Sequence, residues 1–238
     1  MNSVGGSSSV SGINGSSSRI SLGVFTVTTG ISLIIASRGG KNDTYAAVLV
    51  FMIGLIQLFE YGVWLDLECL PGSSNDKASR GSYALIWAMP AILSIVGFLY
   101  AERVVGDGAG RWLMLGAGFA LTALLVGILP TAFTEKTTWC SAPGNIWQPV
   151  WWWQREKSPL APNSLWLVGM LVPTLLIDPL GLGAGTLALA GGSYYVGRLT
   201  DKVSNGEWLS VTALLANSIG LWALLLPGIR LSLFGPEW

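Results

Sequence analysis

A polar face inside an apolar stretch is the feature of this sequence best suited to chemistry. Gln57, Glu60, Tyr61 and Trp64 are spaced by three and four residues, so on a helix they share one face. That face combines an amide, a carboxyl, a phenol and an indole. A carboxyl group inside a bilayer must be neutral, paired or hydrated. Two interpretations stay open: Glu60 is the ionisable centre of a ligand site, or it lies near the interface and reaches the lipid headgroups.

Seven apolar stretches make up most of the 238-residue chain and would position this face. Only 11% of the residues are charged, whereas soluble domains carry about 25%. Most stretches approach the roughly 20 apolar residues that cross a bilayer. We therefore predict an all-α, polytopic bundle of transmembrane helices, with spans at 20–36, 45–64, 83–100, 112–133, 164–181, 182–197 and 208–227. A very short Asp-Pro-Leu-Gly connection joins the fifth and sixth spans, so six spans are the alternative.

Residues 1–18 differ in composition from the rest of the chain, because they are mostly serine, glycine and asparagine. Such a segment has too little apolar surface to bury. We predict a disordered tail over residues 1–18, followed by a single transmembrane domain over residues 19–238.

The spans divide the connecting loops between two faces of the membrane. We call side A the face with the N-terminal tail and the loops 65–82, 134–163 and 198–207, and side B the opposite face. Side A carries slightly more Lys and Arg, which weakly favours a cytoplasmic side A. Cys69 and Cys140 both fall in side A loops, and a disulfide between them would make side A luminal or extracellular. We favour the disulfide; two free thiols are the alternative.

The tryptophans are concentrated on side A. Interfacial aromatic belts are the ordinary explanation, but such belts occur at both interfaces. The dense run at residues 147–153 predicts that the 134–163 loop lies on the interface or caps the bundle, and a ligand-facing or partner-facing surface is the alternative. The side A set is Trp64, Trp87, Trp139, Trp147, Trp151, Trp152, Trp153, Trp166 and Trp208.

Other spans carry groups at a depth similar to that of Glu60. The predicted ligand site comprises Gln57, Glu60, Tyr61, Trp64, Trp87, Trp166 and Asn217. Asp178, the other charged residue inside the apolar stretches, precedes Pro179 and lies toward side B. It suits a helix N-cap, with an ion-coordinating helix break as the alternative.

The composition argues against several functional classes. The chain has no histidine, which is the commonest ligand of metals and haem. The spans contain no lysine for a retinal Schiff base, and the sequence shows no phosphate-binding glycine loop and no Cys-x-x-Cys. A net charge of zero gives no support for nucleic-acid binding. We expect that the protein is not an enzyme and that it is embedded in the lipid bilayer. The sequence indicates no particular cofactor.

The motif Gln-x-x-Glu-x-x-x-Trp at residues 57–64 resembles an uncharacterised polytopic family of algae and large DNA viruses. The similarity covers mainly residues 50–100 and does not include the tail. The resemblance brings no activity, but it implies that Glu60, Trp64 and Cys69 belong to one unit. Further matching positions are Asp66, Asn75, Tyr83 and Pro90, with weaker similarity at Trp139, Cys140 and the fifth span.

Two functions fit these features. The first is a small-solute or ion transporter, channel or sensor with a polar pocket centred on Glu60. The second is a non-catalytic accessory subunit of a larger membrane complex, such as a pigment- or lipid-containing one. Scarce buried charge and small-residue packing faces, for example at Gly181 and Gly185, favour membrane-protein partners.

Overall fold

Four long helices form the part of the chain that the structure describes. The computed structural model describes residues 8–39, 42–67, 69–101, 104, 106, 108–134, 138–143, 149–151, 169–170 and 172–177. The helices are α1 (Ser8–Ser37), α2 (Asp43–Trp64), α3 (Ser74–Tyr100) and α4 (Gly108–Thr134). Two short strands, β1 (Ala142–Pro143) and β2 (Pro149–Val150), form an antiparallel pair.

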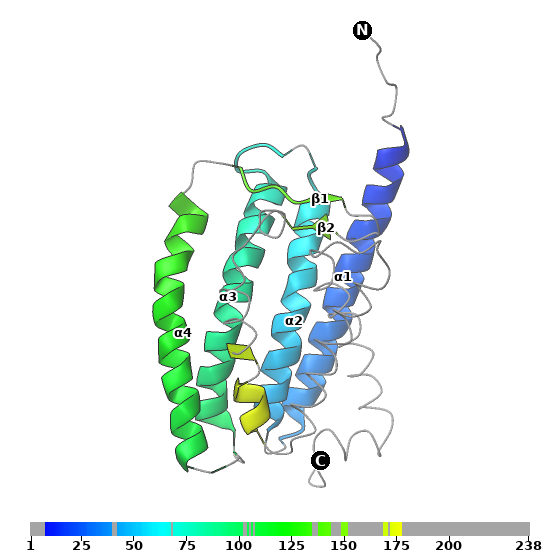
Figure 1. Ribbon diagram of the computed structural model, residues 1–238. Coiled ribbons are helices and arrows are strands. Elements are labelled where there is room, and N and C mark those ends of the chain that lie inside the picture. The colour runs from blue at the N-terminus through cyan, green and yellow to red at the C-terminus, as the bar shows by residue number, and fades with distance from the viewer. Residues whose placement is uncertain are drawn as a thin grey trace, which may run out of the picture.

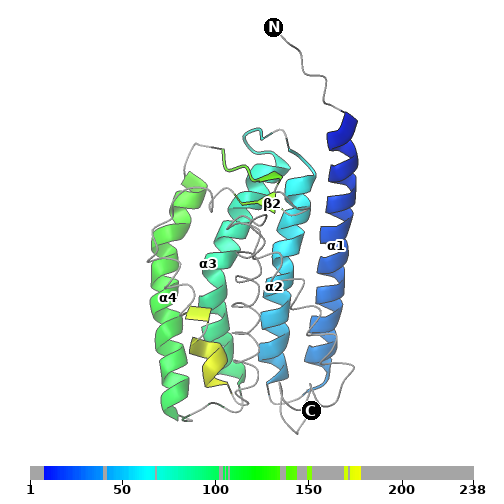
Figure 2. The ribbon, with the colours of Figure 1, turned by 45° about the vertical axis from the view of Figure 1, so that its right-hand side comes forward.

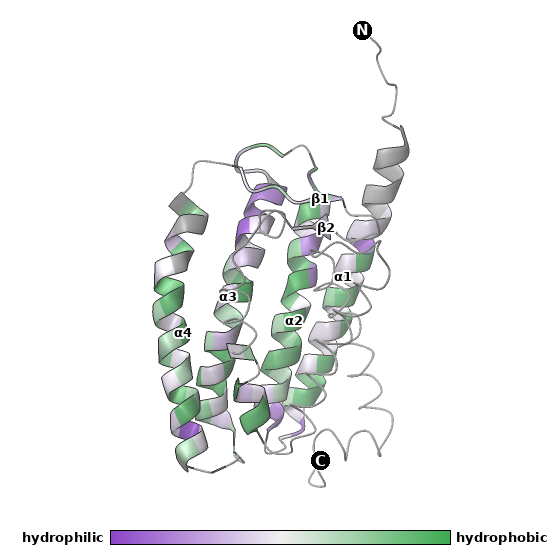
Figure 3. Cartoon of the chain, viewed as in Figure 1, coloured by the Kyte–Doolittle hydropathy of each residue, from purple (hydrophilic) through white to green (hydrophobic). Residues whose placement is uncertain are grey.

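The helices stand side by side in the order α1, α2, α3, α4, and each runs antiparallel to the one before it (Figures 1 and 2). All four are long and apolar enough to cross a membrane, and apolar residues dominate their middle turns (Figure 3). The prediction of a helical membrane protein is confirmed to this extent. The fifth span is described only in part, and the spans at 182–197 and 208–227 lie outside the described residues, so the count of seven stays a prediction.

The third helix begins nine residues before the predicted span, at Ser74 rather than at residue 83. The side-chain oxygen of Ser73 caps it by accepting a hydrogen bond from the backbone N–H of Asp76 at 3.2 Å. The acidic Asp76 in the first turn complements the helix dipole. Hydropathy marks where a helix enters hydrocarbon, which is not where its hydrogen bonding starts.

The first helix also extends into the serine-rich segment. It begins at Ser8, inside the segment for which the sequence predicts a tail. Adding a turn to an existing helix is far easier than nucleating one, and the apolar turns that follow supply the nucleus. Ser17, in this segment, is fully buried.

Small residues let α1 and α2 approach closely. A Cβ placed on Gly54 of α2 would lie 2.6 Å from Cγ2 of Thr28 on α1. Near side B, Ser32 Oγ donates a hydrogen bond to the carbonyl oxygen of Ala47 at 2.8 Å. Lipid is as apolar as the helices, so close packing and interhelical hydrogen bonds are what hold membrane helices together.

An apolar core fills the space between α2, α3 and α4 toward side B. Ile177, from the short segment at 172–177, packs into this core, and its backbone pairs with Val104 in an isolated antiparallel bridge. The core therefore includes side chains from the loops as well as the helices. Its buried members are Tyr45, Leu49, Met52, Met89, Leu93, Ala101, Met114, Met170 and Ile177.

We expect Gly54→Ala to lower the free energy of unfolding by about 1–3 kcal/mol, because the added methyl overpacks the contact with Thr28. The matched control is Gly127→Ala on α4, where a Cβ would meet no atom within 4 Å. Thermal unfolding in detergent, followed by circular dichroism, measures the difference. Equal midpoints for the two variants would contradict the close approach of α1 and α2.

Candidate functional site

Glu60 lies at the contact between α1 and α2, in the half of α2 nearer side A. Its side chain is fully buried, and its Oε2 accepts a hydrogen bond from Ser21 Oγ at 3.4 Å. Ser21 is itself fully buried. The carboxyl group therefore points into the protein and not out toward the headgroups, which was the alternative interpretation of this residue.

Three further polar side chains extend this site along the same two helices. Gln57, one turn before Glu60, is fully buried, and its amide neighbours the carboxyl group. Trp64, one turn after Glu60, is 4% exposed, and Ser17, one turn before Ser21, is fully buried. Because the two helices are antiparallel, Ser17 and Trp64 lie at the same, side A end of the contact. We call these five residues the α1–α2 polar cluster.

Several polar atoms of the α1–α2 polar cluster make no hydrogen bond of good geometry within the described part of the chain. They are both amide atoms of Gln57, the hydroxyl oxygen of Ser17 and the indole nitrogen of Trp64. An unsatisfied buried polar group costs about 1–3 kcal/mol, so such groups rarely gather without a ligand, an ion or ordered water to pair with. Among the described residues, the cluster thus offers donors and acceptors with unused hydrogen-bonding capacity beside an ionisable carboxyl group.

The other predicted site residues are placed as follows. Tyr61 is half-buried next to Glu60 in the sequence. Trp87 packs with apolar residues between α3 and α4, and its ring meets Tyr83 edge-on at 6.3 Å between centroids. The structure therefore places Gln57, Glu60 and Trp64 on one buried face of α2, while the contacts of Trp87 belong to a different cluster. Trp166 and Asn217 lie outside the described residues, as does Asp178.

Sequence reasoning missed the contribution of α1. Ser17, Ser21, Thr28 and Ser32 form a buried polar stripe along it, and this stripe faces α2. The signal was available in the spacing of four, seven and four residues, which is helical and interrupts an otherwise apolar span.

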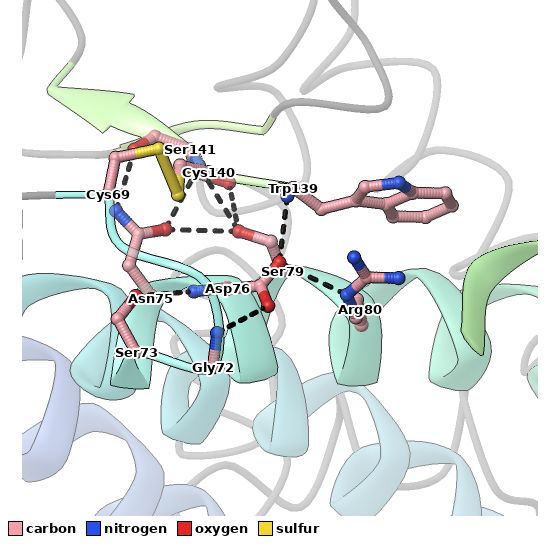
Figure 4. Close-up of a disulfide and its surroundings, with 10 residues drawn as sticks. All are labelled: Cys69, Gly72, Ser73, Asn75, Asp76, Ser79, Arg80, Trp139, Cys140 and Ser141. Atoms are coloured by element: carbon pink, nitrogen blue, oxygen red, sulfur yellow. Dashed lines mark hydrogen bonds and ion pairs between the residues drawn. A yellow bond between two sulfur atoms is a disulfide. The ribbon is translucent and has the colours of Figure 1, made fainter. Parts of the chain in front are cut away.

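A disulfide joins Cys69, just after α2, to Cys140, just after α4, with Cα atoms 5.4 Å apart (Figure 4). The predicted disulfide is thus present, and its two loops lie at the same end of the bundle. The bond links residues 71 positions apart. Closing a loop of that length removes chain entropy from the unfolded state and contributes about 4 kcal/mol in the loop-entropy model.

Asp76 organises the backbone beside this disulfide (Figure 4). Its Oδ1 accepts hydrogen bonds from the backbone N–H of Trp139 at 2.7 Å and from Nε of Arg80 at 3.0 Å. Its Oδ2 accepts from the backbone N–H of Gly72 at 3.1 Å. Hydrogen bonds to a charged acceptor are roughly twice as strong as neutral ones. One carboxylate therefore ties together the α2–α3 loop, α3 and the segment after α4.

Asn75 and Ser141 form a reciprocal pair in the same region. The Asn75 amide donates to the carbonyl oxygen of Ser141 at 2.9 Å, and the backbone N–H of Ser141 donates to Oδ1 of Asn75 at 2.9 Å. The hydroxyls of Ser79 and Ser141 lie 2.7 Å apart. We call Cys69, Asn75, Asp76, Ser79, Arg80, Trp139, Cys140 and Ser141 the side A cap. Its polar atoms hold chain segments together, which is a structural role.

The tryptophan-rich loop folds onto the helices where it is described. The ring of Trp139 packs edge-on against Tyr83 at 5.1 Å, and the Arg80 guanidinium lies 5.2 Å from its centroid. Trp151 is fully buried and packs with apolar residues of α2 and α3. These two tryptophans cap the bundle, in agreement with one of the predicted interpretations of this loop.

No protein-family model, curated protein or solved structure matches this chain. The family resemblance of the 57–64 motif therefore stays a prediction. In the described part of the chain, no group of three or more acidic or cysteine side chains is placed to hold a metal ion.

We expect Cys69 and Cys140 of the protein extracted from native membranes to resist alkylation by a maleimide-linked polyethylene glycol until the protein is reduced. Cys69→Ser should free the Cys140 thiol, so this variant gains one adduct without reductant, seen as one shift on a gel. In sealed vesicles of known orientation, an impermeant reductant added on the luminal or extracellular side should open the bond. Adducts on the unreduced native chain would contradict the disulfide.

Proposed function

We propose that this protein binds a small polar solute or cation at the α1–α2 polar cluster, acting as a transporter, channel or sensor rather than an enzyme. One observation supports this most strongly: a fully buried Glu60 carboxyl group sits beside a buried Gln57 amide whose atoms make no hydrogen bond of good geometry within the described residues. Ionisable groups within membrane spans are costly and are retained mainly where a pathway or ligand needs them.

The arrangement of the cluster suits a ligand that arrives from side A. Ser17 and Trp64 are buried polar side chains that lie beyond Glu60, toward the side A end of the α1–α2 contact. A carboxyl group attracts a cation or shares its proton, while the amide and indole N–H supply donors that a small polar solute needs. We infer that Glu60 is the ionisable centre and that its neighbours orient the solute.

The hydroxyls of α1 continue beyond Glu60 toward side B. Thr28 Oγ1 donates to the carbonyl oxygen of Val24 at 2.7 Å, and Ser32 Oγ donates to that of Ala47. A hydroxyl that donates one hydrogen bond still has lone pairs that accept another. This stripe of hydroxyls continues the polar groups of the α1–α2 contact beyond Glu60, and because the helices touch at Gly54 and Thr28 it favours movement of a proton over passage of a larger ion.

We expect Glu60→Gln to reduce ion flux by about tenfold or more, since an isosteric amide keeps the shape but loses the charge that stabilises a cation. The full chain in liposomes, under an imposed potential, is assayed for uptake of protons, Na⁺ and K⁺ in turn. Flux of one of these ions through the native protein, lost in Glu60→Gln, is the expected result.

A pair of hydroxyl deletions on α1 provides the control for this experiment. Ser21→Ala removes the hydrogen-bond donor to Glu60 and should also lower flux. Thr26→Val removes an exposed hydroxyl that bonds only its own helix, at the Leu22 carbonyl oxygen, and should leave flux unchanged. Equal flux in native protein and Glu60→Gln, both folded, would refute the role of Glu60.

The second candidate function is a non-catalytic subunit of a larger membrane complex. The broad exposed apolar face of α4, which includes Trp112 and Phe119, supports it. Purification from native membranes in mild detergent separates the two functions. Stoichiometric partner proteins would favour the subunit function, and ion flux through the isolated chain would favour the transporter.

A further inference from the structure

The outward face of α4 carries a seven-residue repeat. Large side chains recur every seven residues and are 61% to 69% exposed. Small or compact residues alternate with them, and these are exposed as well. Spacings of four and three residues place all of them in one line along the helix. This α4 seam consists of Trp112, Gly116, Phe119, Ala123, Val126, Pro130 and Phe133.

An exposed face of α1 carries a matching repeat. Its large members Ile20, Val27 and Ile34 are 41% to 50% exposed. A Cβ added at either Gly23 or Gly30, which lie between them, would meet no atom within 4 Å. With Ser37, these residues again follow spacings of three and four. This α1 seam consists of Ile20, Gly23, Val27, Gly30, Ile34 and Ser37.

We propose that copies of this chain associate head to tail in the membrane, with the α1 seam of one copy packed against the α4 seam of the next. The two seams lie on the two end helices of the row α1 to α4 (Figures 1 and 2). A contact between two different surfaces of the same molecule is heterologous, so repeating it gives a closed ring or an open row.

Helix direction supports this pairing. The two end helices run in opposite directions within one copy (Figure 1). Two copies inserted with the same orientation therefore present α1 and α4 to each other as an antiparallel pair. A repeat of 3.5 residues on both faces suits the shallow left-handed crossing common among membrane helices.

The sizes of the side chains are complementary in the antiparallel register. Apart from Phe133, which lies beyond the end of the α1 seam, each large residue of one seam meets a small or compact residue of the other, so the two helices can interdigitate. The pairs are Phe119 with Gly30, Val126 with Gly23, Val27 with Ala123 and Ile34 with Gly116. The same register places Trp112 opposite Ser37 and Ile20 opposite Pro130.

Like-with-like contacts fit less well. Two copies related by a two-fold axis along the membrane normal would pair α4 with α4 in parallel, and Phe119 would then face Phe119 while Gly116 faced Gly116. Large residues would hold the helices apart and leave voids at the glycines, which forfeits dispersion contacts. The second copy therefore fits best through the α1–α4 contact.

The area available is sufficient for a specific contact. An aromatic side chain buries about 150–250 Å² when fully enclosed, and Trp112, Phe119 and Phe133 each expose more than half of their surface. With the aliphatic and small members of both seams, the contact would bury on the order of 1,000 Å², the lower bound for specific interfaces.

Cysteine crosslinking in the membrane tests the contact. Copies with Gly30→Cys and differently tagged copies with Phe119→Cys are co-expressed as full chains, and the membranes are treated with a mild oxidant. We expect crosslinked dimers carrying both tags at about fivefold or more over the control pair, since a disulfide needs Cβ atoms about 3.8 Å apart. The control pair is Leu22→Cys with Leu124→Cys, which are exposed but are not spaced by three or four residues from any seam position.

Two homotypic mixtures complete the crosslinking experiment. Copies that all carry Gly30→Cys, or that all carry Phe119→Cys, should crosslink no more than the control pair. A stronger signal from either mixture than from the α1–α4 pair would overturn the head-to-tail contact in favour of a two-fold dimer. Equal signals from every pair, at the level of random collision, would show that lipid alone covers these faces.

A bulky substitution provides an independent measurement. Gly30→Leu adds a side chain in open space, so the fold should persist while the seam is blocked. Mass photometry of the protein in native lipid particles should show a shift from oligomers to monomers, with the association constant reduced by about tenfold or more. Ala36→Leu, exposed but outside the seam, should leave the distribution unchanged. A monomeric native protein, or an unchanged Gly30→Leu, would overturn the proposal.

Discussion

Inside a bilayer a polar atom has no water to bond with, and the described part of this chain is arranged around that constraint. Hydroxyls of α1 meet it by bonding to α2, as Ser32 does with the Ala47 carbonyl oxygen and Ser21 does with Glu60. The glycine at position 54 lets the two helices come close enough for such short side chains to reach across. The placement of the carboxyl group follows from this close approach.

Two polar regions meet the same constraint in different ways. In the side A cap, Asp76, Asn75 and Ser141 exchange hydrogen bonds with one another and with the backbone, and the disulfide fixes the segments that they join. In the α1–α2 polar cluster, Gln57 and Trp64 keep polar atoms without such partners within the described residues. A saturated network rigidifies a structure, whereas open donors and acceptors mark a place where something else can bind. The cap therefore serves as the frame, and the cluster is the site that we propose for the ligand.

The lipid-facing surface of the described helices is subject to the opposite preference, because apolar side chains are favourable there. Lipid accepts any apolar side chain, so exposure of Phe119 or Ile34 alone decides nothing. The regular alternation of large and small residues on both end helices is a stronger pattern, because only a facing helix gains from it. The inner contact between α1 and α2 already uses the same device at Gly54, and the seams would use it between copies.

The sequence by itself determined the apolar lengths that become helices, the common face of Gln57, Glu60 and Trp64, and the side shared by Cys69 and Cys140. These follow from hydropathy, from the 3.6-residue helical period and from counting spans. Only the tertiary structure decided which helix faces Glu60, that Trp87 packs elsewhere, and that Asp76 bonds the backbone of a residue 63 positions away. A periodic pattern tells which side of a helix is buried. Which other segment packs against that side depends on how side chains from distant parts of the chain fit together, and no single segment encodes that fit.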